Sequence, residues 1–165
     1  MSSIRIATLA ACSALSLAAH GACEVHLSQR ALDYGALHPP AHQQAWQGPA
    51  QTVQVTVRCT QPQPVGFVLA GDGLGDEWAF GGGSVRLALG EAWLDGQPVA
   101  LLRRAGKGQA EHQAGTGLRL GDTWLAASPG QVLQVQLFIE ARLPAEAWQA
   151  RDRYQARGEL LIRAL

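Results

Sequence analysis

The sequence is poor in charge, in cysteine and in long hydrophobic runs. Only 16% of its 165 residues are charged, and it contains three cysteines. Beyond residue 22 no segment is long and apolar enough to span a bilayer as a helix. Without Arg5, which lies in that first segment, 12 basic and 13 acidic residues give a net charge near −1. Nothing in the composition therefore favours nucleic acid or an anionic membrane as a partner.

Recognisable catalytic and metal-binding motifs are also missing. The chain has no G-x-S-x-G nucleophile motif. His38 and His42 are four residues apart, but the two prolines between them rule out a helical metal pair. The loop "GDGLGDE" lacks both the lysine of a phosphate-binding loop and the spaced oxygen ligands of an EF-hand, so it is best explained as a flexible turn. We therefore expect no catalytic residues, no metal site and no cofactor, and we expect that the protein is not an enzyme.

The first 22 residues have the three-part pattern of an export signal. A short basic start, "MSSIR", precedes the apolar run "IATLAACSALSLAA" and the small residues "AHGA". We predict a signal peptide over residues 1–22, cleaved after Gly21 or Ala22, and one domain over residues 23–165. An alternative is lipidation at Cys12, because "LAAC" resembles a lipoprotein box. The apolar run before Cys12 is short for that purpose and continues past it.

Two cysteines remain after cleavage, Cys23 and Cys59. In an oxidising compartment an even pair indicates a disulfide. The bridge would close the loop of residues 24–58, for which the chain-entropy model gives about 4 kcal/mol of stabilisation. Two free, buried thiols are the alternative.

Apolar residues recur with a period of two in several segments, which is the pattern of half-buried β-strands. In "QTVQVTVRC" and "CEVHL" both cysteines fall on the apolar face, so a bridge within one sheet or between two sheets is expected. The segments "QVLQVQLFIE" and "RYQARGELLIRAL" alternate in the same way. Less regular strand candidates cover 64–71, 84–94 and 98–104, "LDGQPV" has the composition of a turn, and 144–151 is the longest helix candidate. Short strands separated by turns predict an all-β sandwich.

The five tryptophans offer one candidate ligand contact. An aromatic ring in a loop can stack on a sugar, although most tryptophans in a sandwich pack in its core or at its rim. Trp78 lies beside acidic residues in a glycine-rich segment. It is the best candidate for contact with a glycan.

The order of these features resembles the pilin domain of chaperone–usher fimbrial subunits. The features are an export signal, an early cysteine, "LDYG" about ten residues later, a second cysteine that ends "VQVTVRC", and an alternating strand at the carboxyl terminus. The resemblance is greatest to fimbrial subunits with a C…DYG start. It is strong over 23–59, moderate over 131–165 and vague between.

The resemblance implies an immunoglobulin-like sandwich that lacks its final strand. A periplasmic chaperone, and then a neighbouring pilus subunit, would fill the gap by β-strand addition, and an outer-membrane usher would assemble the fimbrium at the cell surface. By position, the donor-strand groove would include Val25, Leu27, Leu160, Ile162 and Ala164. "LDYG" would supply the tyrosine-bearing end of the first strand and its glycine turn.

Two departures from that family change the expectation. Its members carry a donor extension before the first cysteine, and here almost nothing lies between the predicted cleavage site and Cys23. This predicts a subunit that accepts a strand without donating one, located at or near the tip. Members also often have an aromatic residue near the carboxyl terminus, where Ala164 and Leu165 stand here. The alternative function is a free-standing, exported β-sandwich that binds carbohydrate.

Overall fold

The computed structural model describes residues 22–37, 45–71, 73–74, 76–80, 82–104, 110–112, 117–148, 154–159 and 161–164. The predicted signal peptide, with Cys12, lies almost wholly outside these residues, and so does Leu160. The described part of the chain is almost entirely strand, and its one helix is a short 3₁₀ turn, Ala145–Trp148, inside the predicted 144–151 segment. The all-β prediction is therefore confirmed. None of the described helical residues forms a segment with the length and hydrophobicity needed to cross a membrane.

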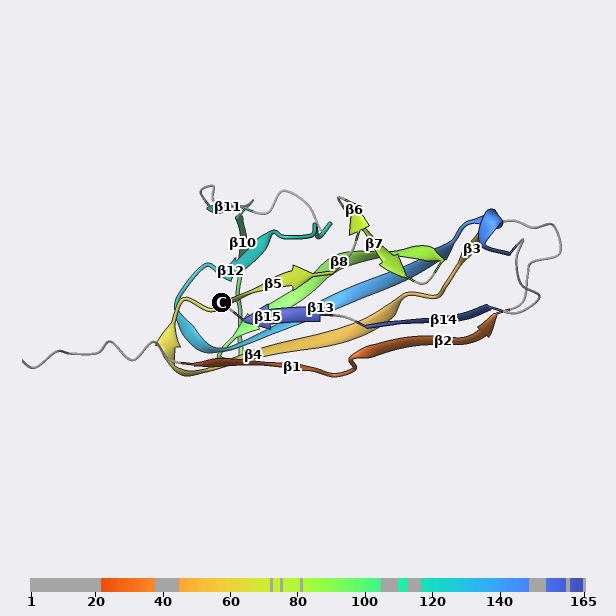
Figure 1. The fold of residues 1–165 in the computed structure, drawn as a ribbon. Helices are drawn as coiled ribbons and strands as arrows, with labels where there is room; N and C mark the ends of the chain where they lie inside the picture. The colour runs from red at the N-terminus through yellow and green to blue at the C-terminus, as the bar shows by residue number, and fades with distance from the viewer. Residues whose placement is uncertain are drawn as a thin grey trace, which may run out of the picture.

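The larger of the two main sheets is antiparallel and has the strand order β1-β4-β13-β8-β7-β6 (Figure 1). Two short strands attach to it, β3 on β13 and β9 on β8. The bounds are β1 Cys23–Leu27, β3 Trp46–Gln47, β4 Gln51–Gln63, β6 Gly73–Leu74, β7 Glu77–Phe80, β8 Gly83–Leu94, β9 Gln97–Pro98 and β13 Gly130–Leu143.

A smaller antiparallel sheet has the order β11-β10-β12-β5-β15, and a separate two-stranded ladder joins β14 to β2. The bounds are β2 Ala31–Leu37, β5 Gly66–Ala70, β10 Leu101–Arg104, β11 Ala110–His112, β12 Thr123–Ala126, β14 Tyr154–Glu159 and β15 Leu161–Ala164. β1 and β15 are thus the outermost strands of their respective sheets.

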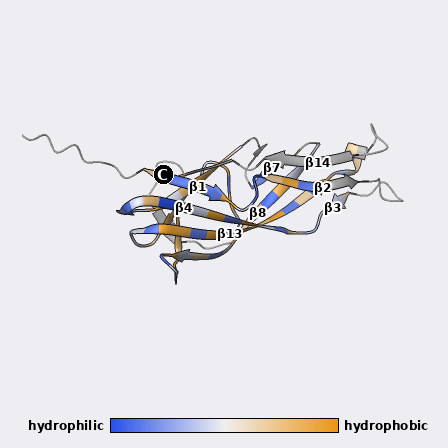
Figure 2. Ribbon diagram, turned by 90° about the horizontal axis from the view of Figure 1, so that it is seen from below, coloured by the Kyte–Doolittle hydropathy of each residue, from blue (hydrophilic) through white to orange (hydrophobic). Residues whose placement is uncertain are grey.

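The core is built by the alternating segments, as their period predicts. The inward residues Val53, Val55 and Val57 are fully buried, whereas Arg58 is exposed. β13 repeats the pattern with Leu133, Val135, Leu137 and Ile139, all fully buried. Figure 2 shows the resulting mixture of hydrophobic and hydrophilic residues along β4 and β13. Side chains on alternate positions therefore form the apolar layer beneath the large sheet.

The "DG" turn is formed as its composition predicts. Asp95 and Gly96 have φ angles of 51° and 82° and connect β8 to β9. Positive φ at both central residues is the requirement of the tight hairpin turn that Asp-Gly favours. The Asp95 carboxylate also accepts a hydrogen bond from the Val132 amide at 2.8 Å, which joins this turn to the start of β13.

Two predicted boundaries are wrong. "LDYG" is not a strand end and turn, because all four residues lie inside β2. Tyr34 extends from β2 to pack edge-to-face against Trp46 (centroids 5.5 Å apart) and Phe80 (5.9 Å). The carboxyl-terminal segment is not one strand either, because β14 pairs with β2 whereas β15 pairs with β5. The first segment pairs with β4 through β1 and with β14 through β2, and the last segment is divided in the same way between two partners. Alternation of apolar residues alone does not reveal these changes of partner.

Candidate functional site at the seam between the first and last strands

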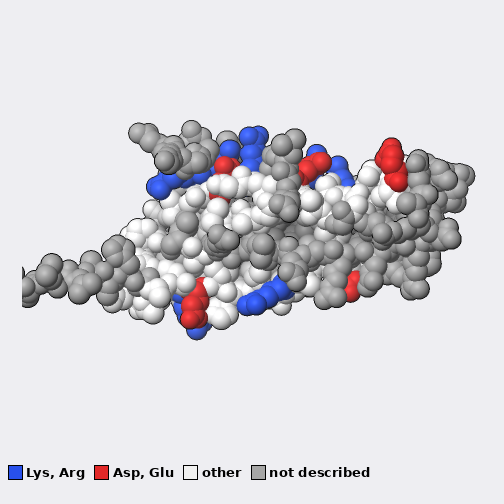
Figure 3. Space-filling view, viewed as in Figure 1, with Lys and Arg blue, Asp and Glu red and all other residues white. Residues whose placement is uncertain are grey.

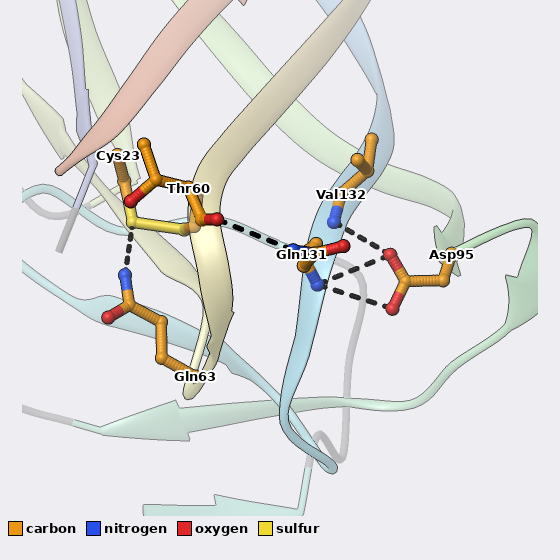
Figure 4. Close-up of a disulfide and its surroundings, with 7 residues drawn as sticks. Cys23, Thr60, Gln63, Asp95, Gln131 and Val132 are labelled. Carbon is orange, nitrogen blue, oxygen red and sulfur yellow. Dashed lines mark hydrogen bonds between the residues drawn. A yellow bond between two sulfur atoms is a disulfide. The ribbon is translucent and has the colours of Figure 1, made fainter. Parts of the chain in front are cut away.

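The first strand is fastened to the large sheet by the predicted disulfide. Cys23 and Cys59 are bonded and lie directly opposite each other in the β1–β4 ladder, with Cα atoms 4.1 Å apart. The bridge therefore joins neighbouring strands of one sheet. The Gln63 side-chain amide donates to Cys23 Sγ at 2.6 Å (Figure 4). This anchors β1 at one end of its five-residue ladder.

The hydrogen-bond pattern of β1 follows from two bonds at its ends. The Thr60 amide donates to the Ala22 carbonyl at 3.2 Å, and the Ser28 amide donates to the Gln54 carbonyl at 2.9 Å. In an antiparallel ladder, hydrogen-bonded pairs alternate with pairs that are not bonded. Residues 24 and 26 therefore bond to β4. Val25 and Leu27 direct their backbone N–H and C=O groups away from β4, towards the outer edge of the sheet.

The same reasoning applies to β15. β5 lies between β12 and β15. On the β12 side, the carbonyls of Leu69 and of Val65, which directly precedes β5, accept hydrogen bonds from the Gly121 and Ala126 amides. Val68 and Ala70, which alternate with these residues, therefore bond to β15 on the opposite side. Val68 pairs with Arg163, and Ala70 pairs with Leu161. The backbone groups of Ile162 and Ala164 consequently point away from β5.

We call the strip between β1 and β15 the seam. The two strands lie beside each other, with Cα atoms within 8 Å, and no ladder joins them among the described residues. The side chains of Val25, Leu27 and Ala164 are partly buried and pack against the core. For Ile162 the structure describes the backbone alone, and Leu160 lies outside the described residues. Four of the five predicted groove residues thus belong to the two strands that border the seam.

The present width of the seam is smaller than a third strand needs. Neighbouring strands lie about 4.8 Å apart, so two strands that flank a third are separated by about 9.6 Å. The approach of β1 to β15 within 8 Å is closer than this. Accepting a strand here requires β1 and β15 to move apart by roughly 2 Å or more.

The seam is closed at one end by the β2–β14 ladder. β2 follows β1 in the chain, and β14 precedes β15. The two terminal segments are therefore paired through β2 and β14 but are not paired through β1 and β15. Tyr34 fixes β2 to the core, and its hydroxyl donates to the Ile139 carbonyl at 3.4 Å. Burial raises the pKa of Tyr34 above its usual 10.0, while the Ala141 backbone lowers it and Glu140 raises it by less.

The candidate glycan contact, Trp78, lies on β7 with only 5% of its surface exposed. Its indole ring packs in the core, so in this structure neither ring face is open to a sugar. The indole N–H has no hydrogen-bond partner among the described residues. The glycine-rich segment contains the short β7 strand, whose alternation turns residues 78 and 80 inward.

On the face drawn in Figure 3, the charged side chains of the described residues do not gather into one patch. Figure 3 shows the visible charged side chains mainly along the margins of that face. Arg103 is paired with the buried Asp122, with Nε 2.6 Å from Oδ2, and Arg86 is paired with Glu77 at 3.1 Å. Within the described ranges no three His, Cys, Asp or Glu residues gather as metal ligands would.

Comparison with known proteins yields no match, whether with family models, curated protein sequences or solved structures.

Proposed function

We propose that this protein is a structural or adhesive subunit of a chaperone–usher surface fimbria, and that it accepts a donor strand at the seam. One observation carries the proposal. The first and last strands of the described chain border the same seam, and Val25 and Leu27 direct their backbone groups into it. An unpaired strand edge is a template for an added strand.

An immunoglobulin-like, incomplete sandwich fits the separation of the strands into two main sheets with β1 and β15 at their edges. An added strand would hydrogen-bond to Val25 and Leu27 and insert alternate apolar side chains between the sheets. The disulfide supports this role because it holds β1 against β4 while its other edge exchanges partners.

The proposed partners are a periplasmic chaperone, an outer-membrane usher and a neighbouring subunit, which together place the protein at the cell surface. The tip position remains a prediction from the short segment before Cys23. Sequencing the amino terminus of the exported protein tests it, because a longer extension ahead of Cys23 contradicts it.

The experiment compares two substitutions on the same strand. Val25→Asp places a charge on the core side of the seam, whereas His26→Asp places one on the exposed face. We expect a chain co-expressed with a candidate pilus chaperone to copurify with it as a stable heterodimer. The His26→Asp chain should do so equally well, and the Val25→Asp chain should lose the complex.

A milder variant guards against simple misfolding. Val25→Ala removes side-chain volume from the seam without adding a charge, and it should weaken the complex while the disulfide still forms. A chain that is a stable monomer and binds no chaperone contradicts the proposal and favours the free-standing carbohydrate-binding alternative.

A further inference from the structure

A second feature lies on the outer face of the large sheet, away from the seam. It is an open hollow of about 210 Å³ beside Phe138, with Ala88, Gly117, Asp76, Arg86 and Glu140 among its lining residues. Phe138 is 38% exposed, more than any other large hydrophobic side chain among the described residues. β1 and β4 separate β13, which carries Phe138, from the seam.

The edge of the Phe138 ring takes the space that a side chain at residue 90 would need. A Cβ atom built on Gly90 would lie 2.8 Å from Phe138 Cε2. Gly90 lies where the β8–β13 register shifts between Val135 and Leu137. The missing side chain at this irregular position therefore leaves room for the Phe138 ring beside the hollow.

The rim of the hollow carries hydrogen-bonding groups whose positions are also supported. Arg86 is held by Glu77 at 3.1 Å. The Gln47 side-chain amide donates to Glu140 Oε2 at 3.4 Å, and Asp76 completes the rim. Carboxylates accept hydrogen bonds from hydroxyl groups, and a guanidinium donates them.

From these features we infer that the hollow binds one neutral pyranose unit of a carbohydrate. The apolar Phe138 face suits the C–H face of a sugar ring, and the rim offers both acceptors and donors to its hydroxyls. The volume is below the roughly 300 Å³ at which pockets for drug-sized ligands begin, which suits a single ring. Two carboxylates against one guanidinium disfavour an anionic sugar. The inference goes beyond strand acceptance and does not depend on it.

The test is a titration of the full chain, followed by two-dimensional NMR, with methyl β-galactoside, methyl α-mannoside and methyl β-glucoside. N-acetylneuraminic acid serves as the anionic comparison. We expect at least one neutral sugar to shift the resonances of Phe138 and Gly117 and the anionic sugar to bind more weakly. Phe138→Ala should weaken binding by about tenfold or more, because stacking on an aromatic ring is lost.

Trp93→Ala is the matched control, because Trp93 is a partly exposed aromatic residue of the same sheet, paired with Gln134. Its partner Gln134 on β13 is four residues from Phe138, about 13 Å along the strand. Binding should survive this change, and Glu140→Gln should weaken it. The inference is overturned by any of three results: no neutral sugar binds at millimolar concentration, Phe138→Ala binds as well as the parent chain, or the anionic sugar binds best.

Discussion

Removing the disulfide should destabilise the protein by an amount that depends on the length of the loop that the bridge closes. The change is the double substitution Cys23→Ala and Cys59→Ala. The bridge spans 36 positions, and loop-closure entropy for this length corresponds to about 4 kcal/mol. Because small domains are stabilised by about 5–15 kcal/mol in total, this is a large share. Without the bridge, β1 is held by its five-residue ladder on β4 and by the packing of Val25 and Leu27 against the core.

The assay is urea unfolding followed by tryptophan fluorescence, which the fully buried Trp124 makes sensitive to loss of the core. The free energy of unfolding should fall by about 4 kcal/mol with a similar m-value. Reduced parent protein serves as the control, because it loses the bridge but keeps the Cys59 sulfur in the core, where only 4% of the residue is exposed. A loss below about 1 kcal/mol in both proteins would refute the reasoning, since it would mean that ladder and packing hold β1 unaided.

Three further changes test the packing and charge of the fold. Gly48→Ala would place a Cβ 2.8 Å from Tyr34 Cε1 and should lower stability by about 1–3 kcal/mol in thermal unfolding. Tyr34→Phe tests the raised pKa of Tyr34. Because burial favours the neutral hydroxyl, its contribution to stability is full below the unfolded pKa of 10.0 and is lost as pH rises through the folded pKa. The phenylalanine variant should therefore lose less stability than the parent chain between pH 9 and 11. Asp122→Ala should cost about 2–3 kcal/mol in urea unfolding, because it leaves the Arg103 guanidinium partly buried without its partner, whereas Glu77→Ala, from an exposed pair, should cost under about 1 kcal/mol. Equal effects at Asp122 and Glu77, an unchanged alkaline profile for Tyr34→Phe, or full stability of Gly48→Ala would contradict the respective argument.

Much of the fold could be predicted from local pattern. A period of two determines which residues of β4 and β13 face the core, and the structure buries those residues. The Asp-Gly turn could be predicted because these two residues favour the positive φ angles of a tight turn. The disulfide could be predicted because an even pair of cysteines remains after the predicted cleavage.

What could not be predicted depends on which strands become neighbours. Alternation indicates which face of a strand is buried but not which strands become its neighbours. No local signal therefore shows that the carboxyl-terminal segment pairs with β2 in its first part and with β5 in its second part. The position of "LDYG" inside β2 depends on the pairing of β2 with β14, which is distant in sequence. The burial of Trp78 also had no local signal, because a glycine-rich context hides the short strand that carries it.

The seam could likewise be predicted only in part. Its side chains could be proposed from sequence, because Val25 and Leu27 share the apolar face of a strand. The direction of their backbone groups required the register of the β1–β4 ladder and the two bonds at its ends. The hollow beside Phe138 had no sequence signal, because it depends on a register shift opposite a glycine.

Amide hydrogen exchange along β1 tests strand acceptance most directly. In the protein alone, the amides of Glu24 and His26 should be protected by β4, and those of Val25 and Leu27 should exchange quickly because they face away from it. When a chaperone or a donor-strand peptide is bound, the Val25 and Leu27 amides should become as protected as their neighbours. Equal protection of all four amides in the protein alone, or fast exchange of Val25 and Leu27 in the complex, would contradict the proposal that the seam accepts a strand.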